Sequence, residues 1–443
     1  MKPPAKTSGS AQSRERVLVE IEKPVYGGAF LARVEGKAIF VPLTLPGEQA
    51  LVRIEEEKRG YAVAEAEQIL KASPERVAPL CRHFGTCGGC DYQHAGYGAQ
   101  LRFKEAILRE TFERAGVAAP EEISALAAEP WAYRNRIRLA FDAAGRAGYR
   151  GRRSHAVVPI EECPIAAPVL VKAALAAAWV ARRFAPALKF SEISLFCDAG
   201  ETALLASLST RGGAKRGFEE FADALSREIP ELKGAELVGE GAAGLPPRLL
   251  AQWGESSLLY SAASFAYRVD PGGFFQINRW LVDALVERVT NGFSGVLAWD
   301  LFAGVGLFAR RLTESFERVV AVESAQAAIH ALEENLRGTN ATAVRASTLD
   351  FLRRACAKER PGAKEHPGLI IVDPPRTGLG AETTAILAEI AAPALVYVSC
   401  DPATLARDLR ALTGSGYAIE SLTLADLFPQ TFHLETVVQL RRR

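Results

Sequence analysis

Hydrophobic and polar positions follow two different rhythms along the chain. Residues 14–71 alternate between apolar and polar positions, as in Val17-Leu-Val19-Glu-Ile21, and turns such as Pro46-Gly47 interrupt the alternation. Alternation with frequent turns is typical of a small antiparallel barrel that buries one face of each strand. From Gly272 onward, short apolar runs alternate with helical segments. That second rhythm indicates a doubly wound parallel sheet.

The two rhythms predict a multidomain α/β chain with three units. The first is the small β-barrel over residues 14–71, the second is an α+β region over 72–270, and the third is a Rossmann-like domain over 271–443. Within the second unit, residues 101–115 have a helical pattern, and we expect this helix to pack against the third unit.

Two segments bear on the cellular location of the protein. The polar first dozen residues predict a disordered tail, because they lack the apolar core of a signal peptide. The apolar stretch 166–181 contains Pro168 and Lys172 and is shorter than the roughly 20 residues that a membrane span requires. We therefore expect a soluble, cytoplasmic protein without a membrane partner.

Four apolar strands of the third unit lead into a chemically active side chain: Asp300, Glu323, Asp373 and Cys400. The carboxyl ends of parallel strands meet at one edge of a sheet, so these side chains should face a common crevice. A glycine-rich turn, Leu301-Phe-Ala-Gly304-Val-Gly306, follows the first strand and lets the backbone approach a ligand. Glu323 comes about 20 residues later, where a carboxylate can accept both hydroxyls of a ribose. The pattern predicts an adenosyl cofactor.

Cys400 is the candidate nucleophile of this crevice. A free cysteine is more often a small buried hydrophobe, because reactivity depends on the pKa and the exposure of the thiol. Here the thiol follows the strand Ala394-Leu-Val-Tyr-Val-Ser399 and precedes Asp401-Pro402, so it should project from the end of the sheet beside the cofactor. That position favours covalent catalysis.

The overall charge does not mark a polycation, since 53 basic side chains face 52 acidic ones. Basic residues are nevertheless concentrated between Trp131 and His155, where Asp142 is the only acidic residue. Arginine suits phosphates and aromatic faces suit unstacked bases, so this stretch predicts a surface that faces RNA. Its arginines are Arg134, Arg136, Arg138, Arg146, Arg150, Arg152 and Arg153, interleaved with Trp131, Tyr133, Phe141 and Tyr149.

Four cysteines suggest one metal centre. Cys81, Cys87 and Cys90 form a C-x5-C-x2-C run among glycines, and Cys163 follows at a distance and precedes a proline. Four thiolates bind zinc or an iron-sulfur cluster, and a close trio with one remote cysteine is more typical of a 4Fe-4S cluster. Disulfides are not expected, because the sequence has no secretion signal and the cytosol keeps thiols reduced.

Four motifs, in this order, resemble those of the RNA uracil-5-methyltransferases. More narrowly, the chain is similar to the subgroup that has an N-terminal TRAM domain and an iron-sulfur cluster and that methylates 23S ribosomal RNA. The resemblance implies a TRAM or OB-like barrel, a class I methyltransferase domain, and S-adenosylmethionine as cofactor. The motifs are Gly272-Gly-Phe-Phe-Gln276-Ile-Asn278, Asp300-Leu-Phe-Ala-Gly-Val-Gly306, Asp373-Pro-Pro-Arg376 and Ser399-Cys-Asp-Pro-Ala-Thr-Leu-Ala-Arg-Asp408.

The same resemblance implies roles for single residues. Cys400 would be the nucleophile, and Glu435 would be the general base. Asp350 would lie near the adenine of S-adenosylmethionine. The remaining implied residues are Gln276, Phe302, Glu323 and Asp373 around that cofactor, and Cys81, Cys87, Cys90 and Cys163 as ligands of a 4Fe-4S cluster.

Uracil chemistry explains why these residue types are needed, because C5 of uracil is a weak nucleophile toward a sulfonium. Addition of Cys400 to C6 would place negative charge on C5, and Glu435 would later remove the C5 proton. His433 is a rival base, and Asp401 or Asp373 could orient the ring instead. The target base must also leave its stack, at a cost of roughly a few kcal/mol.

We therefore expect a monomeric enzyme that methylates C5 of one uridine in RNA, with 23S ribosomal RNA as the substrate. Three alternatives stay open. One is a transfer RNA uridine methyltransferase with the same chemistry, and another is RNA cytosine-5 methylation, whose nucleophile lies in different motifs. The third is a non-catalytic RNA-binding or assembly factor, which the intact Cys400 and Glu435 argue against.

Overall fold

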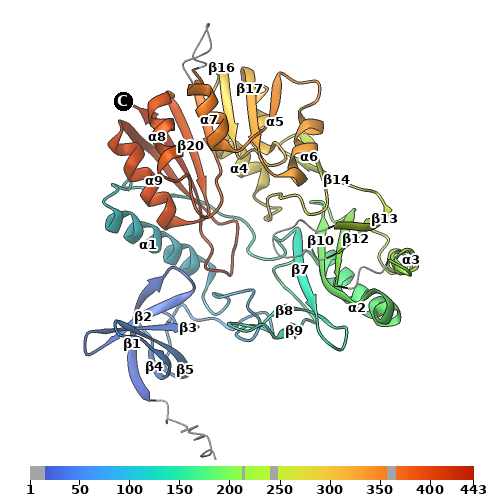
Figure 1. Ribbon diagram of the computed structural model, residues 1–443. Helices are drawn as coiled ribbons and strands as arrows, with labels where there is room; N and C mark the ends of the chain where they lie inside the picture. The colour runs from blue at the N-terminus through green and yellow to red at the C-terminus, as the bar shows by residue number, and fades with distance from the viewer. Residues whose placement is uncertain (1–14, 212–214, 240–247, 357–365) are drawn as a thin grey trace, which may run out of the picture.

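The computed structural model describes residues 15–211, 215–239, 248–356 and 366–443. Figure 1 shows three bodies: a blue N-terminal barrel, a green central sheet and an orange-to-red C-terminal sheet, with α1 (Tyr97–Ala115) between the barrel and the C-terminal sheet. The expected tail over the first dozen residues lies outside the described ranges. Within those ranges, no helix is long and apolar enough to cross a membrane.

The N-terminal strands close into a barrel, as the alternation predicts. Neighbouring strands follow the order β1-β2-β3-β5-β4, and β4 pairs with β1 to close it. Side chains such as Phe30, Val41 and Val52 fill the interior and are fully buried. The expectation of an antiparallel barrel is wrong in one place, because β5 returns from β4 in the direction of β3 and pairs with it in parallel. The strands are β1 (Arg16–Val25), β2 (Ala29–Val34), β3 (Lys37–Pro42), β4 (Gln49–Glu57) and β5 (Tyr61–Lys71).

The central body is a seven-stranded sheet with the order β13-β12-β11-β10-β7-β8-β9. Two helices, α2 and α3, share its core, where Leu170, Phe221 and Leu195 are fully buried. The middle of the arginine-rich stretch forms the hairpin of β7 and β8. The elements are β7 (Arg136–Phe141), β8 (Ala147–Arg150), β9 (Val157–Pro159), α2 (Pro168–Leu188), β10 (Phe190–Cys197), β11 (Leu204–Thr210), α3 (Phe218–Glu228), β12 (Leu232–Gly239) and β13 (Arg248–Gly254).

The C-terminal body is an eight-stranded sheet with the order β18-β17-β16-β19-β20-β22-β21-β6. The first five strands in this order, from β18 through β17, β16 and β19 to β20, are parallel. β22 lies between β20 and β21 and is antiparallel to both. The doubly wound prediction is confirmed, and the strand order reverses between β16 and β19, where such sheets bind ligands. The hairpin β14 (Leu258–Ala262) and β15 (Phe265–Val269) precedes this sheet.

The other elements of the C-terminal body are α4 (Val282–Thr290), β16 (Gly295–Leu301), α5 (Leu307–Leu312), β17 (Phe316–Glu323), α6 (Gln326–Leu336), β18 (Ala341–Arg345), α7 (Thr348–Cys356), β19 (Leu369–Val372), α8 (Ala381–Ile390), β20 (Ala394–Ser399), α9 (Pro402–Gly414), β21 (Tyr417–Ala425) and β22 (Glu435–Arg442).

Two segments from earlier in the chain complete this C-terminal body. β6 (Ser124–Leu126) adds a parallel edge strand beside β21. Helix α1 buries Leu108 and Phe112 in the core that also holds Trp299. The expectation that this helix packs against the C-terminal domain is therefore confirmed.

Buried polar contacts tie α1 to the loop between β21 and β22. The ammonium of Lys104 donates to Asp426 Oδ1 at 2.5 Å, and neither side chain has exposed surface. Lys104 also donates to the carbonyl of Phe428 at 3.0 Å. The amide of Gln100 donates to Gln430 Oε1 at 2.9 Å and accepts from the Gln430 main-chain N–H at 2.9 Å. This loop leads directly into Glu435, so α1 helps to fix where β22 begins.

Candidate active site and cysteine pocket

Cys400 lies at the sharp turn between β20 and α9. The carboxylate of Asp401 caps α9 by accepting hydrogen bonds from the N–H groups of Ala403 at 3.1 Å and Thr404 at 2.9 Å. Such caps stabilise the first turn of a helix, so they fix the turn that carries the thiol. Asp401 therefore stabilises the start of α9, which makes it a weaker candidate for orienting the uracil ring.

Strand pairing brings Glu435 beside the thiol. The ladder between β20 and β22 ends with Ser399 opposite Thr436, so Cys400, which leaves the sheet, lies beside Glu435, the first residue of β22. The hydroxyl of Thr436 donates to the carbonyl of Ser399 at 3.2 Å and locks this register. The resemblance paired these two residues as nucleophile and base, and the fold brings them together.

The groups around Cys400 affect one another electrostatically. Burial, with the charges of Glu435 and Asp373, raises the pKa of the Cys400 thiol to about 11 against the opposing effect of Arg376. Burial, with help from Asp373, also raises the pKa of Glu435 well above its usual value, and Arg376 again lowers it. Burial raises the pKa of Asp373 to about 7. A carboxylate with a raised pKa is a better proton acceptor, which suits a general base.

His433 is held in a different arrangement. Its Nδ1 lies 3.1 Å from Nη2 of Arg376, which can only donate, so that ring nitrogen accepts. Burial, followed by the charge of Arg376, lowers the pKa of His433 to about 4. The imidazole is therefore neutral at ordinary pH, and this nitrogen is already engaged, which favours Glu435 as the base.

The glycine-rich turn after β16 has the backbone that a close ligand approach requires. Phe302, Gly304 and Gly306 all have positive φ angles, of 70°, 57° and 89°. A Cβ added at Gly306 would lie 2.8 Å from Leu332 Cδ1, so only glycine fits there. The carboxylate of Glu323 accepts from the Gly304 N–H at 2.9 Å, which places this acid against the turn.

Asp300 is a buried acid that the sequence reasoning placed at a strand end without selecting it as a site residue. Its Oδ2 accepts from the Ala309 N–H at 2.8 Å, and within the described ranges Oδ1 has no hydrogen-bond partner. Burial, with the charges of Asp373 and Glu323, raises its pKa to about 7. Its position after a fully apolar strand was the signal that could have selected it.

Two other residues implied around the cofactor lie on separate segments. Gln276 is buried, and its main-chain carbonyl accepts from the Asn135 amide at 2.8 Å. Asp350 is exposed in the first turn of α7, where its carboxylate accepts from the Ser347 hydroxyl at 2.7 Å. The contact of Asp350 with adenine stays a prediction.

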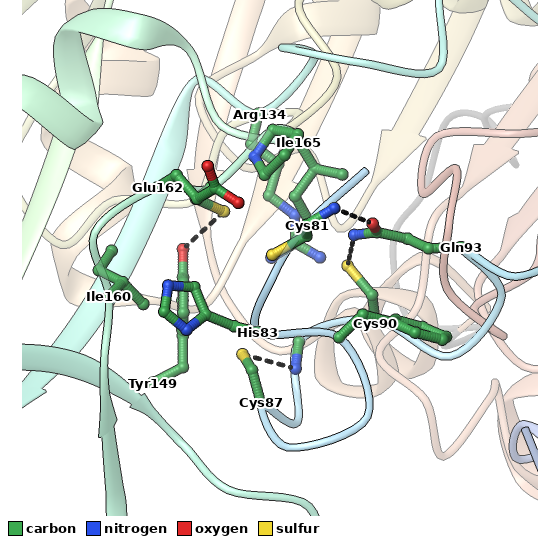
Figure 2. A pocket seen from close by; sticks show the side chains of 14 residues that line it. Cys81, His83, Cys87, Cys90, Gln93, Arg134, Tyr149, Ile160, Glu162 and Ile165 are labelled. Carbon is green, nitrogen blue, oxygen red and sulfur yellow. Dashed lines mark hydrogen bonds between the residues drawn. The ribbon is translucent and has the colours of Figure 1, made fainter. Parts of the chain in front are cut away.

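The four cysteines line one pocket, which encloses about 400 Å³ of empty space, part of it open to solvent. Figure 2 shows Cys81, Cys87 and Cys90 around this space, with Tyr149 opposite. The Gly89 N–H donates to Cys87 Sγ at 3.4 Å, and Gln93 donates to Cys90 Sγ at 3.2 Å. Tyr149 Oη lies 3.8 Å from Cys163 Sγ.

The pocket suits a soft metal centre by its donor set. Burial raises the pKa of Cys87 to about 11 and of Cys90 to about 12, and the charge of Arg134 lowers both. Amide and guanidinium donors beside thiols are groups that stabilise thiolates. Across the described part of the chain, no three His, Cys, Asp or Glu side chains are grouped closely enough to hold a single metal ion.

The aromatic side chains of the arginine-rich stretch are less available than the sequence suggested. Tyr133 has no exposed surface, and its hydroxyl donates to the carbonyl of Pro429 at 3.0 Å. Tyr149 packs against the central core and faces the cysteine pocket. Arg138 is exposed but pairs with Glu192. Contacts within the protein therefore occupy several side chains of this stretch.

One further side chain reaches the site from the barrel. The hydroxyl of Tyr26 donates to the main-chain carbonyl of Cys400 at 3.4 Å. Sequence reasoning missed it, because the contact joins residues 374 positions apart and no local pattern marks it.

Known families match this chain at both ends. The family model described as tRNA (Uracil-5-)-methyltransferase matches residues 251–443, and the TRAM domain model matches residues 11–66. The fold is similar to that of the tRNA (uracil-54, C5)-methyltransferase of Pyrococcus abyssi in complex with S-adenosyl-L-homocysteine, with a TM-score of 0.74, 24% identity, and coverage of 95% of this chain and 99% of that one.

Two relatives match over nearly the whole length. A 23S rRNA (uracil(1939)-C(5))-methyltransferase RlmD of Halomonas elongata is 32% identical over 451 residues, covering 99% of this chain and 92% of that protein. An uncharacterized RNA methyltransferase of Streptomyces avermitilis is 34% identical over 450 residues, covering 96% of this chain and 98% of that protein. With Cys400 and Glu435 side by side at the end of a doubly wound sheet, these matches show that the chain belongs to the RNA uracil-5-methyltransferase family.

Proposed function

We propose that this chain uses S-adenosylmethionine to methylate C5 of one uridine in 23S ribosomal RNA. The observation that carries the proposal is the placement of Cys400 beside Glu435, within the field of Asp373 and Arg376. A thiol and a base at neighbouring strand ends of one sheet edge are the two groups that C5 alkylation of uracil needs.

The residues would act in this order. The Cys400 thiolate forms a bond to C6, and the C5–C6 π electrons move toward the C4 carbonyl as an enolate. C5 then attacks the methyl carbon of the sulfonium, whose bond to sulfur breaks to leave S-adenosylhomocysteine. Glu435 accepts the C5 proton, and the electrons of that C–H bond expel Cys400 and restore the ring. Burial of Glu435 raises its pKa and so makes it more basic.

The S-adenosylmethionine site would form around the turn after β16. Glu323 is proposed to bind the ribose hydroxyls, because it already faces the Gly304 N–H. Gln276, Phe302, Asp350 and Asp373 are proposed to line the remainder of the site. A titration of S-adenosylhomocysteine against Glu323→Ala and against Glu317→Ala, an exposed glutamate at the start of the same strand, tests this assignment.

Ribosomal RNA is favoured as the substrate by the name of the Halomonas relative and of a 32% identical relative from Pseudomonas entomophila. Transfer RNA is favoured by the description of the family model and by the structural neighbour from Pyrococcus. The two relatives named RlmD are similar over nearly their whole length and share more sequence with this chain than the Pyrococcus protein does, so ribosomal RNA takes precedence. We further propose a monomer that acts in the cytoplasm.

We also propose that Cys81, Cys87, Cys90 and Cys163 hold a 4Fe-4S cluster. When bound, the cluster would link the run at 81–90 to the loop between β9 and α2. Iron and sulfide assays after anaerobic purification test this. Cys90→Ser should lose most of the iron, whereas Cys197→Ser, at a buried cysteine of the central core, should keep it. Equal iron in both variants would remove the proposal.

We propose that each of the three units expected from the sequence has its own function. Residues 14–71 would bind RNA, residues 72–270 would carry the cluster and the arginine-rich stretch, and residues 271–443 would transfer the methyl group. The TRAM match supports the first assignment.

Trapping with 5-fluorouridine tests the reaction, because fluorine cannot leave C5 as a proton does. The protein is incubated with S-adenosylmethionine and 5-fluorouridine-substituted ribosomal or transfer RNA, and the adduct is mapped by mass spectrometry. We expect a methylated adduct on Cys400 with ribosomal RNA and none with Cys400→Ala. An adduct only with transfer RNA would overturn the substrate, and no adduct with either RNA would overturn the mechanism.

A further inference from the structure

The turn between β1 and β2 of the barrel extends into the active site. Tyr26 lies in this turn, and its hydroxyl donates to the carbonyl of Cys400 at 3.4 Å. Its ring meets the ring of Phe432 edge-on, with centroids 5.5 Å apart and planes at 86°. Phe432 precedes Glu435 by three residues. One barrel side chain therefore contacts both the turn that carries the nucleophile and the loop that carries the base.

The contact between barrel and catalytic domain is reciprocal. Tyr26 is half-buried and packs against the core of the C-terminal sheet, whereas Phe432 of the C-terminal loop packs against the core of the barrel. Each body thus inserts one aromatic side chain into the other. An interlocked aromatic pair resists sliding better than two flat surfaces, because either ring must leave its pocket before the bodies can move.

A third segment fixes the same junction. Asp91, which follows Cys90, accepts from the Phe432 N–H at 3.3 Å and donates its own N–H to the carbonyl of Gln430 at 2.9 Å. Gly28 of the barrel turn packs so closely that an added Cβ would lie 2.9 Å from the Asp91 carboxyl carbon. The barrel turn, the cysteine run and the loop before Glu435 therefore meet at one point.

The electrostatic surroundings of Tyr26 agree with this geometry. Burial, with the charges of Asp401, Cys400 and Glu435, raises the pKa of Tyr26 to about 12 against the opposing effect of Arg376. The hydroxyl therefore stays protonated at working pH and serves as a donor. The same charged groups surround the candidate nucleophile, which places Tyr26 at the edge of the reacting groups.

We propose that Tyr26 is a positioning residue for the covalent step, holding the Cys400 turn through its hydroxyl and the approach to Glu435 through Phe432. The barrel then contributes to chemistry as well as to RNA binding. This inference rests on the proposed covalent mechanism. It differs from a role in binding, because a positioning residue changes the rate at saturating RNA and leaves the affinity for RNA in place.

The test is the rate of adduct formation on Cys400 at saturating 5-fluorouridine RNA and S-adenosylmethionine, measured with the full chain. Tyr26→Ala should lower this rate by about 10- to 100-fold, because small displacements of reacting groups cost that much. Tyr26→Phe, which loses only a long hydrogen bond, should lower it by about threefold. The RNA dissociation constant should change by less than about twofold in both variants, since neither ring nor hydroxyl is proposed to hold RNA.

The matched control is Tyr61→Ala. Tyr61 is an equally aromatic barrel residue that is 40% exposed and contacts Phe40 of the barrel, away from the junction. It should keep the wild-type adduct rate at saturating RNA. Tyr26→Leu keeps apolar bulk in the junction and serves as a second variant if Tyr26→Ala does not fold.

The outcomes distinguish a failure of the positioning role of Tyr26 from a failure of the proposed covalent mechanism. If the wild-type protein forms no adduct on Cys400, the covalent mechanism fails. If the wild-type protein forms the adduct and both Tyr26→Ala and Tyr26→Leu form it at the same rate, the positioning role of Tyr26 is overturned. It is also overturned if these variants weaken only the affinity for RNA. The same holds if a smaller folded fraction or weaker binding of S-adenosylhomocysteine accounts for the whole loss of adduct rate.

Discussion

The buried pair between Lys104 and Asp426 offers the sharpest test of how the modules are joined. Lys104→Met removes the ammonium, keeps most of the apolar stem, and leaves the Asp426 carboxylate in a site with no exposed surface. Asp426 Oδ2 makes no hydrogen bond within the described ranges, and the neighbouring Tyr97 hydroxyl is neutral, so it can compensate only part of the charge. The Phe428 carbonyl would lose its donor as well.

Breaking a buried ion pair by removing one partner costs about 3–5 kcal/mol, because the other charge stays buried and unpaired. The matched control is Arg102→Met on the same helix. Arg102 pairs with Glu75 at the surface, with side chains 61% and 44% exposed. An exposed pair of this kind is worth about 0–1 kcal/mol. The two substitutions therefore differ by several kcal/mol in expected effect, although they lie two residues apart.

The assay is urea unfolding followed by tryptophan fluorescence, since Trp299 lies in the core that α1 covers. The double variant Lys104→Met with Asp426→Leu should regain at least half of the lost free energy of unfolding, because replacing both buried charges by apolar groups is often neutral. A loss below about 1 kcal/mol in Lys104→Met, equal to that of Arg102→Met, would refute the reasoning that this junction depends on a buried pair.

Two further outcomes follow from the site and the barrel. Because the pKa of Cys400 is raised to about 11, the thiolate is the minor form at neutral pH, and adduct formation should rise about tenfold per pH unit between roughly pH 6 and pH 9. Arg376→Met removes the cation that lowers this pKa, so its profile should be displaced toward higher pH; identical profiles would contradict the assignment. Gly28→Ala should lower the free energy of unfolding by about 1–3 kcal/mol, because Gly28 has a φ of 83° and the added Cβ would contact Asp91. Gly36→Ala has a similar φ of 82° and open space, so it should cost only about 1 kcal/mol; equal losses would refute the contact.

The gathering of side chains at the C-terminal sheet edge was predictable from the sequence because its signals are local. Asp300, Glu323, Asp373 and Cys400 each follow an apolar run, and the rule that strand ends share one edge gathers them without any knowledge of long-range contacts. The closed barrel was predictable for the same reason, since alternation is a property of neighbouring residues.

The remainder depends on contacts that no local pattern encodes. Tyr26 reaches Cys400 across 374 positions, and Lys104 meets Asp426 across 322. The parallel pairing of β3 with β5 follows from closure of the barrel rather than from either strand. Tyr133, which composition suggested as a stacking surface, is fully buried, and its hydroxyl donates to a main-chain carbonyl in the loop before Glu435.

The short strand β6 has a consequence for anyone who wishes to isolate the catalytic part. It covers the outer edge of β21 through the pairs Thr423 with Ser124 and Ala425 with Leu126. A fragment that begins after residue 126 would expose that edge, and unpaired strand edges recruit other chains. We expect such fragments to self-associate through β21. A minimal catalytic fragment should therefore include β6, and also α1, because α1 buries Leu108 and Phe112 in the core of this sheet.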